Sequence, residues 1–143
     1  MTSDTQGSRS FSFELFPPKT PAGMEKLKAT VTDLRALGPE FLSVTYGAGG
    51  STQERTFATV DWLREEHIAT APHLSCIGAT RDEIGDILQR YRNQGITRLV
   101  ALRGDLPSGA GLSEPDELRY ANELVAFIRA ETGDSFHIEV AAY

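Results

Sequence analysis

The chain has 143 residues, and its 14 Lys and Arg side chains against 20 Asp and Glu side chains give a formal net charge of -6. An acidic balance argues against binding to nucleic acid or to an anionic membrane surface, because both favour basic patches. The length suits one ordinary domain with a hydrophobic core. A single cysteine, Cys76, excludes an internal disulfide and a multi-cysteine zinc site, and it is typical of a reducing compartment such as the cytoplasm.

The chain starts with a polar segment, residues 1–10, which lacks the apolar core of a signal peptide and is expected to be a disordered tail. A first strand is predicted over residues 11–16. Thr20 then predicts a helix N-cap, with Pro21 at the first helical position. Apolar residues recur at helical spacing from there to Gly38, which ends the helix.

Strand-like and helix-like segments keep alternating after this point. Ser51 with Glu54, and Thr80 with Glu83, form capping boxes that predict the starts of a second and a third helix. Leu118 begins the apolar stripe of a fourth helix. The predicted strands cover residues 11–16, 41–46, 69–76, 96–102 and 136–143. This alternation implies a parallel sheet with right-handed crossovers, and no apolar run approaches the roughly 20 residues of a membrane span.

Alternate residues of a strand face opposite sides of the sheet, so each predicted strand divides into two sets. The set expected on an open, inner face is Ser12, Glu14, Ser43, Thr45, Ala71, His73, Ser75, Ala101, Arg103, Asp105, His137, Glu139, Ala141 and Tyr143. The set expected against helices is Phe11, Phe13, Leu15, Leu42, Val44, Leu74, Val100, Leu102, Ile138 and Val140. One face is therefore polar or small in every strand, whereas a doubly wound sheet is apolar on both faces.

The α/β class that accounts for this pattern is the (β/α)₈ or TIM barrel, whose outer face meets helices and whose inner face lines a site. The alternative is a sheet with one side facing solvent. A whole barrel takes roughly 250 residues. Residues 11–143 are therefore predicted to form the amino-terminal part of one barrel domain, with about five strands and four helices.

Glu14 is the first candidate for chemistry, because it lies in sequence among Phe11, Phe13, Leu15 and Phe16. Removal from water favours the uncharged form of a carboxyl group, and an acid that stays protonated can donate a proton. The alternative role is an ordinary ion pair at the end of a strand.

Arg103 and Asp105 flank Gly104, which permits close approach of a planar ligand to the backbone. Their alternative role is a local ion pair. His73 is expected to face inward, where a lone histidine is more often a hydrogen-bonded core residue than a ligand. A metal site that combines His73 with Cys76 is rejected, because the two residues lie on opposite faces of the predicted strand.

Two common site types fit poorly. Residues 47–52 match a dinucleotide-binding fingerprint only loosely, because Thr52 replaces the third glycine, and they are interpreted as a mobile strand-to-helix loop. A Schiff-base aldolase needs a lysine at the end of a strand. Lys19, Lys26 and Lys28 all lie on the first loop and helix instead.

Five segments match, in the same order, the motifs of one enzyme family. They are residues 13–20 (FELFPPKT), 43–50 (SVTYGAGG), 71–76 (APHLSC), 101–107 (ALRGDLP) and 140–143 (VAAY). On these motifs the chain resembles the catalytic domain of the methylenetetrahydrofolate reductases over nearly all of its length after the tail. Leu15 and Lys19 are mild departures, because many relatives have Phe and Arg there.

The resemblance implies a flavin-bearing (β/α)₈ barrel that uses FAD, with NADH or NADPH as hydride donor, to reduce 5,10-methylenetetrahydrofolate to 5-methyltetrahydrofolate. It implies that Glu14 is the acid that helps to open the five-membered ring of the folate, and that Asp105 lies beside the flavin and the folate. The FAD contacts that it implies are Thr45, Tyr46, Ala48, His73, Arg103, Gly104, Asp105, Tyr120, Ala121 and Tyr143.

The same resemblance implies a cytoplasmic enzyme with a folate as its small-molecule substrate and a homo-oligomeric state of the full-length protein. The later strands of the family complete the FAD site, so the segment alone is predicted to be inactive. Two alternatives stay open. One is a flavin-free barrel lyase or isomerase, and the other is a non-catalytic barrel fragment.

Overall fold

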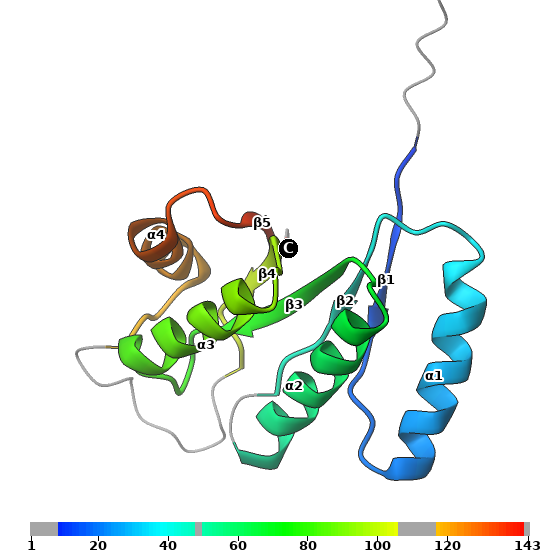
Figure 1. Cartoon of the computed structure of the whole chain (residues 1–143). Coiled ribbons are helices and arrows are strands. Elements are labelled where there is room, and N and C mark those ends of the chain that lie inside the picture. The colour runs from blue at the N-terminus through cyan, green and yellow to red at the C-terminus, as the bar shows by residue number, and fades with distance from the viewer. Residues whose placement is uncertain (1–8, 48–49, 106–116, 142–143) are drawn as a thin grey trace, which may run out of the picture.

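The computed structural model describes residues 9–47, 50–105 and 117–141, so most of the predicted tail and residues 48, 49, 142 and 143 lie outside the described part. Its elements are β1 (Ser12–Leu15), α1 (Pro21–Arg35), β2 (Phe41–Val44), α2 (Gly50–Glu65), β3 (Thr70–Ser75), α3 (Arg81–Asn93), β4 (Arg98–Leu102), α4 (Ala121–Thr132) and β5 (His137–Val140). The strands form one parallel sheet in the order β1-β2-β3-β4-β5 (Figure 1). The predicted alternation and the parallel sheet are confirmed.

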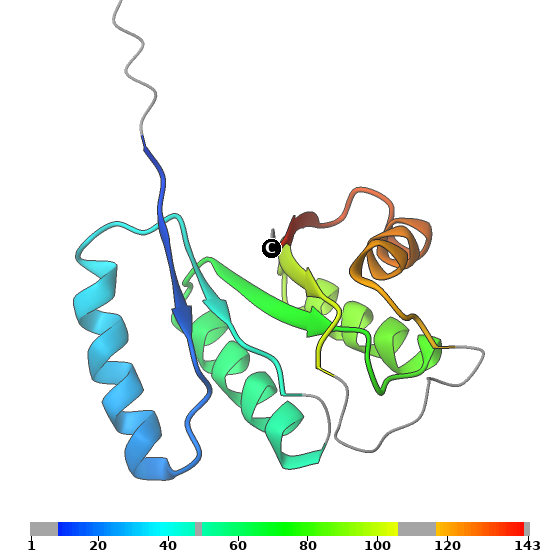
Figure 2. The same ribbon diagram turned by 180° about the vertical axis from the view of Figure 1, so that it is seen from behind.

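All four helices lie on the same face of the sheet. Helices α2 and α3 stand in front of the strands in Figure 1 and behind them in Figure 2, while α1 and α4 lie to either side of the sheet. Side chains of all four helices belong to one core cluster with the strands. The core lies between these two layers, where Leu42, Leu74 and Leu99 of the sheet meet Leu63 and Leu88 of the helices. A doubly wound sheet carries helices on both faces, so this arrangement is that of part of a (β/α)₈ barrel.

Local signals set the starts of two helices as predicted. Thr20 Oγ1 accepts a hydrogen bond from the backbone N–H of Gly23 at 3.0 Å, with Pro21 at the first helical position. The Thr80–Glu83 capping box is formed in full, with N–O distances of 2.7 and 3.2 Å. Helix α2 begins at Gly50, and the side chain of Ser51 lies outside the described part, so the predicted capping box of Ser51 with Glu54 stays a prediction.

The inner face of β4 differs from the prediction. Ser75 of β3 pairs with Leu102, which places Val100 and Leu102 on the inner face. Leu99 and Ala101 are fully buried and belong to the core against the helices. The expectation that Ala101 faces inward and that Val100 and Leu102 face the helices is therefore wrong. Two of the five residues of β4, Val100 and Leu102, therefore present apolar side chains to the inner face.

The prediction for β4 is wrong because the strand ends at Leu102. Arg103 and Asp105 follow Leu102, the last residue of the strand, so they do not obey the alternation of side chains along the strand. Gly104 has φ +85°, a left-handed conformation that turns the backbone between them. Asp105 is consequently directed into the cavity of the inner face, although simple alternation along the strand would place it on the same face as Ala101.

An arginine on β4 joins three strands at the amino end of the inner face. Arg98 Nη1 lies 2.5 Å from Oε1 of Glu139 on β5, and Arg98 Nη2 lies 3.1 Å from Oε1 of Glu40, just before β2. The guanidinium also lies 4.4 Å from the ring centroid of Phe41. These contacts span β3, which lies between β2 and β4, and they close this end of the sheet.

Two further arginines hold the loops that enter the strands at the same end. Arg64, in the last turn of α2, donates to the carbonyl oxygens of Ile68 at 3.1 Å and Gln94 at 3.2 Å. Arg129 in α4 donates to the carbonyl oxygen of Phe136 at 2.7 Å. The loops before β3, β4 and β5 are therefore each tied to a helix by a charged donor, which makes the stronger kind of hydrogen bond. Within the described ranges no helix is long and apolar enough to cross a membrane.

Replacement of Arg98 by Met should lower the free energy of unfolding by about 1–3 kcal/mol, because it leaves two partly buried carboxylates without their partner. Urea unfolding of the two proteins measures the difference. The matched control is Lys28→Met, which removes an exposed pair with Glu25 and should cost less than about 1 kcal/mol. Equal losses in the two variants would contradict a stabilising role for the Arg98 contacts.

Candidate active site at the carboxyl end of the sheet

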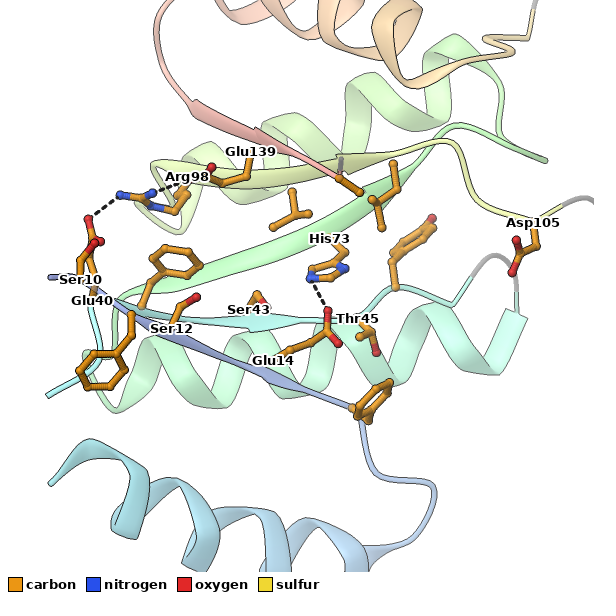
Figure 3. Close-up of a pocket in the computed structure, with 17 residues that line it drawn as sticks. Ser10, Ser12, Glu14, Glu40, Ser43, Thr45, His73, Arg98, Asp105 and Glu139 are labelled. Carbon is orange, nitrogen blue, oxygen red and sulfur yellow. Dashed lines mark hydrogen bonds and ion pairs between the residues drawn. The ribbon is translucent and has the colours of Figure 1, made fainter. Parts of the chain in front are cut away.

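The open face of the sheet carries a cavity of about 870 Å³, here called the inner-face cavity (Figure 3). Glu14, Thr45, Tyr46, His73 and Asp105 all line it. In Figure 3 Asp105 lies toward the carboxyl ends of the strands and the Arg98 contacts lie toward the amino ends, with Glu14 and His73 between them. The first strand and the turn after the fourth strand thus direct two acids into one cavity.

A second cavity of about 630 Å³, the strand-end cavity, lies beyond the carboxyl end of β4. Among the predicted site residues, it is lined by Tyr46, Arg103, Gly104, Asp105 and Ala121. Small side chains make up much of the remaining wall, namely Ser75, Ala101 and Ala141. Tyr46 and Asp105 line both cavities, so the two spaces adjoin.

Helix α2 fixes the residues that follow β2. The hydroxyl of Thr56, which is fully buried, donates to the carbonyl oxygen of Thr45 at 3.0 Å. Gln53 Nε2 donates to the hydroxyl oxygen of Tyr46 at 2.8 Å. Burial raises the pKa of Tyr46 above its ordinary value, so its phenol stays neutral at physiological pH. Tyr46 is therefore held as a neutral polar group at the border of the two cavities.

The turn after β4 is held by β3 and by the segment that follows it. The backbone N–H of Ile77 donates to the carbonyl oxygen of Arg103 at 3.0 Å, and Cys76 Sγ lies 3.5 Å from the same oxygen. The Arg103 guanidinium lies 5.4 Å from the ring centroid of Tyr120, within the range of a cation–π contact. A Cβ added at Gly104 would lie 3.0 Å from Cβ of Ser75, so a larger residue does not fit without a shift.

Glu14 and His73 contact one another across the inner face. Glu14 Oε1 lies 3.5 Å from His73 Nε2, and the two side chains are 52% and 8% exposed, respectively. Burial lowers the pKa of His73 below its ordinary value, and the negative charge of Glu14 opposes this shift in part. His73 is consequently a neutral imidazole at physiological pH.

The expected burial of Glu14 among aromatic residues is wrong for this structure. Its neighbours Phe13 and Leu15 contact the core on the helix side of β1, because successive side chains of a strand point to opposite faces. Phe16 follows the strand and is 71% exposed. Glu14 therefore stands on the open face with half of its surface in contact with water.

The remaining predicted site residues are placed as follows. Seven of the ten predicted cofactor contacts line one or both cavities: Thr45, Tyr46, His73, Arg103, Gly104, Asp105 and Ala121. Tyr120 is exposed and contacts Arg103, whereas Ala48 and Tyr143 lie outside the described residues. The assignment of all ten residues as FAD contacts stays a prediction. Sequence reasoning missed Arg98, which also lines the inner-face cavity. Alternation along β4 places Arg98 on the same face as Val100 and Leu102, so the correct assignment of that face would have found it.

Among the residues that the structure describes, no three His, Cys, Asp or Glu side chains come together in a way that could hold a metal ion. The polar groups of the two cavities include Glu14 beside a neutral His73, the neutral phenol of Tyr46, and the guanidinium of Arg103 and the carboxylate of Asp105 on either side of Gly104. Such donors and acceptors suit an organic ligand.

A parallel sheet with helices on one face and a cavity on the other is the arrangement of a barrel-type α/β protein. The sequence profile described as methylenetetrahydrofolate reductase matches residues 1–143, and the chain belongs to that family. The resemblance inferred from the sequence motifs is therefore confirmed.

Individual relatives agree with this assignment. The 5,10-methylenetetrahydrofolate reductases of Salmonella typhimurium and Escherichia coli are 44% and 43% identical to the chain over 141 residues, which cover 98% of this chain and 46% of each relative. Methylenetetrahydrofolate reductase (NADH) 1 of Arabidopsis thaliana is 39% identical, over 96% of this chain and 24% of that protein. The chain thus spans about half the length of the bacterial relatives.

Replacement of Gly104 by Ala should destabilise the protein by about 1–2 kcal/mol, because φ +85° is costly for a residue with a Cβ and the new methyl group meets Ser75. Gly85→Ala is the matched control. Gly85 lies within α3 with nothing within 4 Å of an added Cβ, so this change should stabilise by about 0.5–1 kcal/mol. Urea unfolding distinguishes the two signs, and equal effects would contradict the stated conformation of Gly104.

The low pKa of His73 predicts a loss of stability at acidic pH. Above its ordinary value of 6.5, the imidazole is neutral in both the folded and the unfolded protein. As the pH falls below 6.5, the unfolded chain binds a proton that the folded protein resists, so the free energy of unfolding decreases. His73→Gln should show a smaller decrease between about pH 7 and pH 5. An equal decrease in both proteins, measured by urea unfolding, would refute the buried neutral state.

Proposed function

We propose that the chain carries the amino-terminal half of the active site of a flavin-dependent enzyme that reduces 5,10-methylenetetrahydrofolate to 5-methyltetrahydrofolate, with NADH or NADPH as hydride donor. The activity belongs to the full-length protein, for which a cytoplasmic location and a homo-oligomeric state are part of the proposal. The observation that carries it is the shared cavity of Glu14 and Asp105 in a chain of this family. The plant relative named as an NADH enzyme supports NADH as one possible donor.

The residues of the two cavities fit FAD. Glycine at position 104 and alanine at 101, 121 and 141 keep part of the wall of the strand-end cavity free of bulky side chains, which suits a flat ring system. Thr45, Tyr46 and His73 supply polar groups, and Arg103 supplies a positive charge at the same place. These residues would hold the cofactor, which carries the hydride between the nicotinamide and the folate when it is bound.

In this proposal, Glu14 has the role of proton donor. Its half-exposed carboxyl group projects into the inner-face cavity, where a bound folate can reach it. Protonation of a nitrogen in the five-membered ring allows that ring to open and leaves an iminium cation at the one-carbon unit. Asp105, in the same cavity, supplies a negative charge that stabilises such a cation. The two acids therefore serve different parts of one reaction.

Glu14→Gln in the full-length protein should lower the rate of folate reduction by about 10²-fold or more, the usual loss for a missing general acid. Flavin binding and flavin reduction by NAD(P)H should persist, and stopped-flow measurement of the two half-reactions separates these effects. Glu40→Gln is the matched control, because Glu40 lines the same cavity at its amino end. It should leave both half-reactions unchanged.

Two results would contradict the proposal. Normal folate reduction by the Glu14→Gln protein would remove Glu14 from the reaction. A colourless full-length protein without flavin absorbance near about 450 nm would favour a flavin-free barrel lyase or isomerase.

A further inference from the structure

The contact between Glu14 and His73 joins strands that are not neighbours. Glu14 lies on β1 and His73 on β3, with β2 between them. Ser43 of β2 pairs directly with Glu14, and Thr45 follows it on the same face. Ser43 and Thr45 are both small, so the longer side chains of Glu14 and His73 meet above them (Figure 3).

The surroundings of His73 single out Glu14 as its charged partner. The other ionisable groups that line the inner-face cavity are Tyr46, Asp105, Arg98, Glu40 and Glu139. Tyr46 is neutral, and Arg98 forms ion pairs with Glu40 and Glu139 at the amino end of the cavity. Asp105 lies at the opposite end (Figure 3). The charge that acts on the imidazole is that of Glu14.

We propose that His73 is a positioning residue for Glu14: its imidazole contacts the carboxyl group and holds it in the orientation from which Glu14 passes a proton to the folate. This role rests on the proposed function and goes beyond contact with the cofactor. The proton passes from Glu14 to the folate nitrogen, Glu14 becomes a carboxylate, and His73 stays neutral. Catalytic contacts of this kind are often long, as at 3.5 Å, before substrate binds.

A double-mutant cycle in the full-length protein tests this role. His73→Asn, whose shorter side chain does not reach the Nε2 position, should slow folate reduction by about 10²-fold. His73→Gln, which places a polar atom near that position, should retain part of the rate. In a Glu14→Gln background, His73→Asn should cause no further loss, because its effect acts through Glu14.

The pH profile gives a readout that a structural role does not move. His73→Asn should change the pH at which the rate of folate reduction falls on the alkaline side of the profile, because the imidazole that contacts the proton donor is lost. Additive losses in the cycle, or an unmoved alkaline limb, would overturn the positioning role while leaving the proposed function intact. A wild-type protein that does not reduce the folate would overturn both.

A second measurement needs no change at His73. Imidazole NMR titration of the full-length protein should show a lower pKa for His73 in Glu14→Gln than in the wild type, because the carboxylate that raises it is lost. Glu40→Gln should leave the titration of His73 unchanged. The same titration in all three proteins would show that the two side chains do not interact in solution, and it would overturn the proposal.

Discussion

The strand order is the constraint on which the site depends. Because the order never reverses, each right-handed crossover returns its helix to the same face of the sheet. One set of alternate side chains is thereby buried against the helices, and the other set is left free for a ligand. Glu14, Ser43 and His73 belong to the free set, so their polar groups are not part of the apolar cluster between the sheet and the helices.

The fold could be predicted from the sequence because its signals are local. Thr20 and Thr80 cap their helices, and the alternation of polar and apolar residues in β1, β2 and β3 matches the two faces of the sheet. The prediction was wrong in β4, where charged residues beyond the strand were read as part of it. The backbone turn at Gly104 decides where Asp105 points, and no periodic pattern contains that information.

The candidate site was predicted less completely, since its contacts join distant parts of the chain. Arg98 contacts Glu139 and Glu40, which lie 41 and 58 positions away in the sequence, and such pairs depend on the register of the strands. The degree of burial of Glu14 also depends on which face it occupies and on what covers that face, not on its aromatic neighbours in sequence. Likewise, Tyr120 and Ala121 could be assigned to the site only from the family motifs, because their helix has no sequence feature that indicates a ligand.

Arg64, Arg98 and Arg129 secure the amino end of the sheet, where the chain enters β2, β3, β4 and β5. The groups proposed to bind ligands stand at the other end or midway along the inner face. Substitutions in the connections that follow the strands can therefore alter ligand binding without disturbing the contacts that hold the amino end of the sheet.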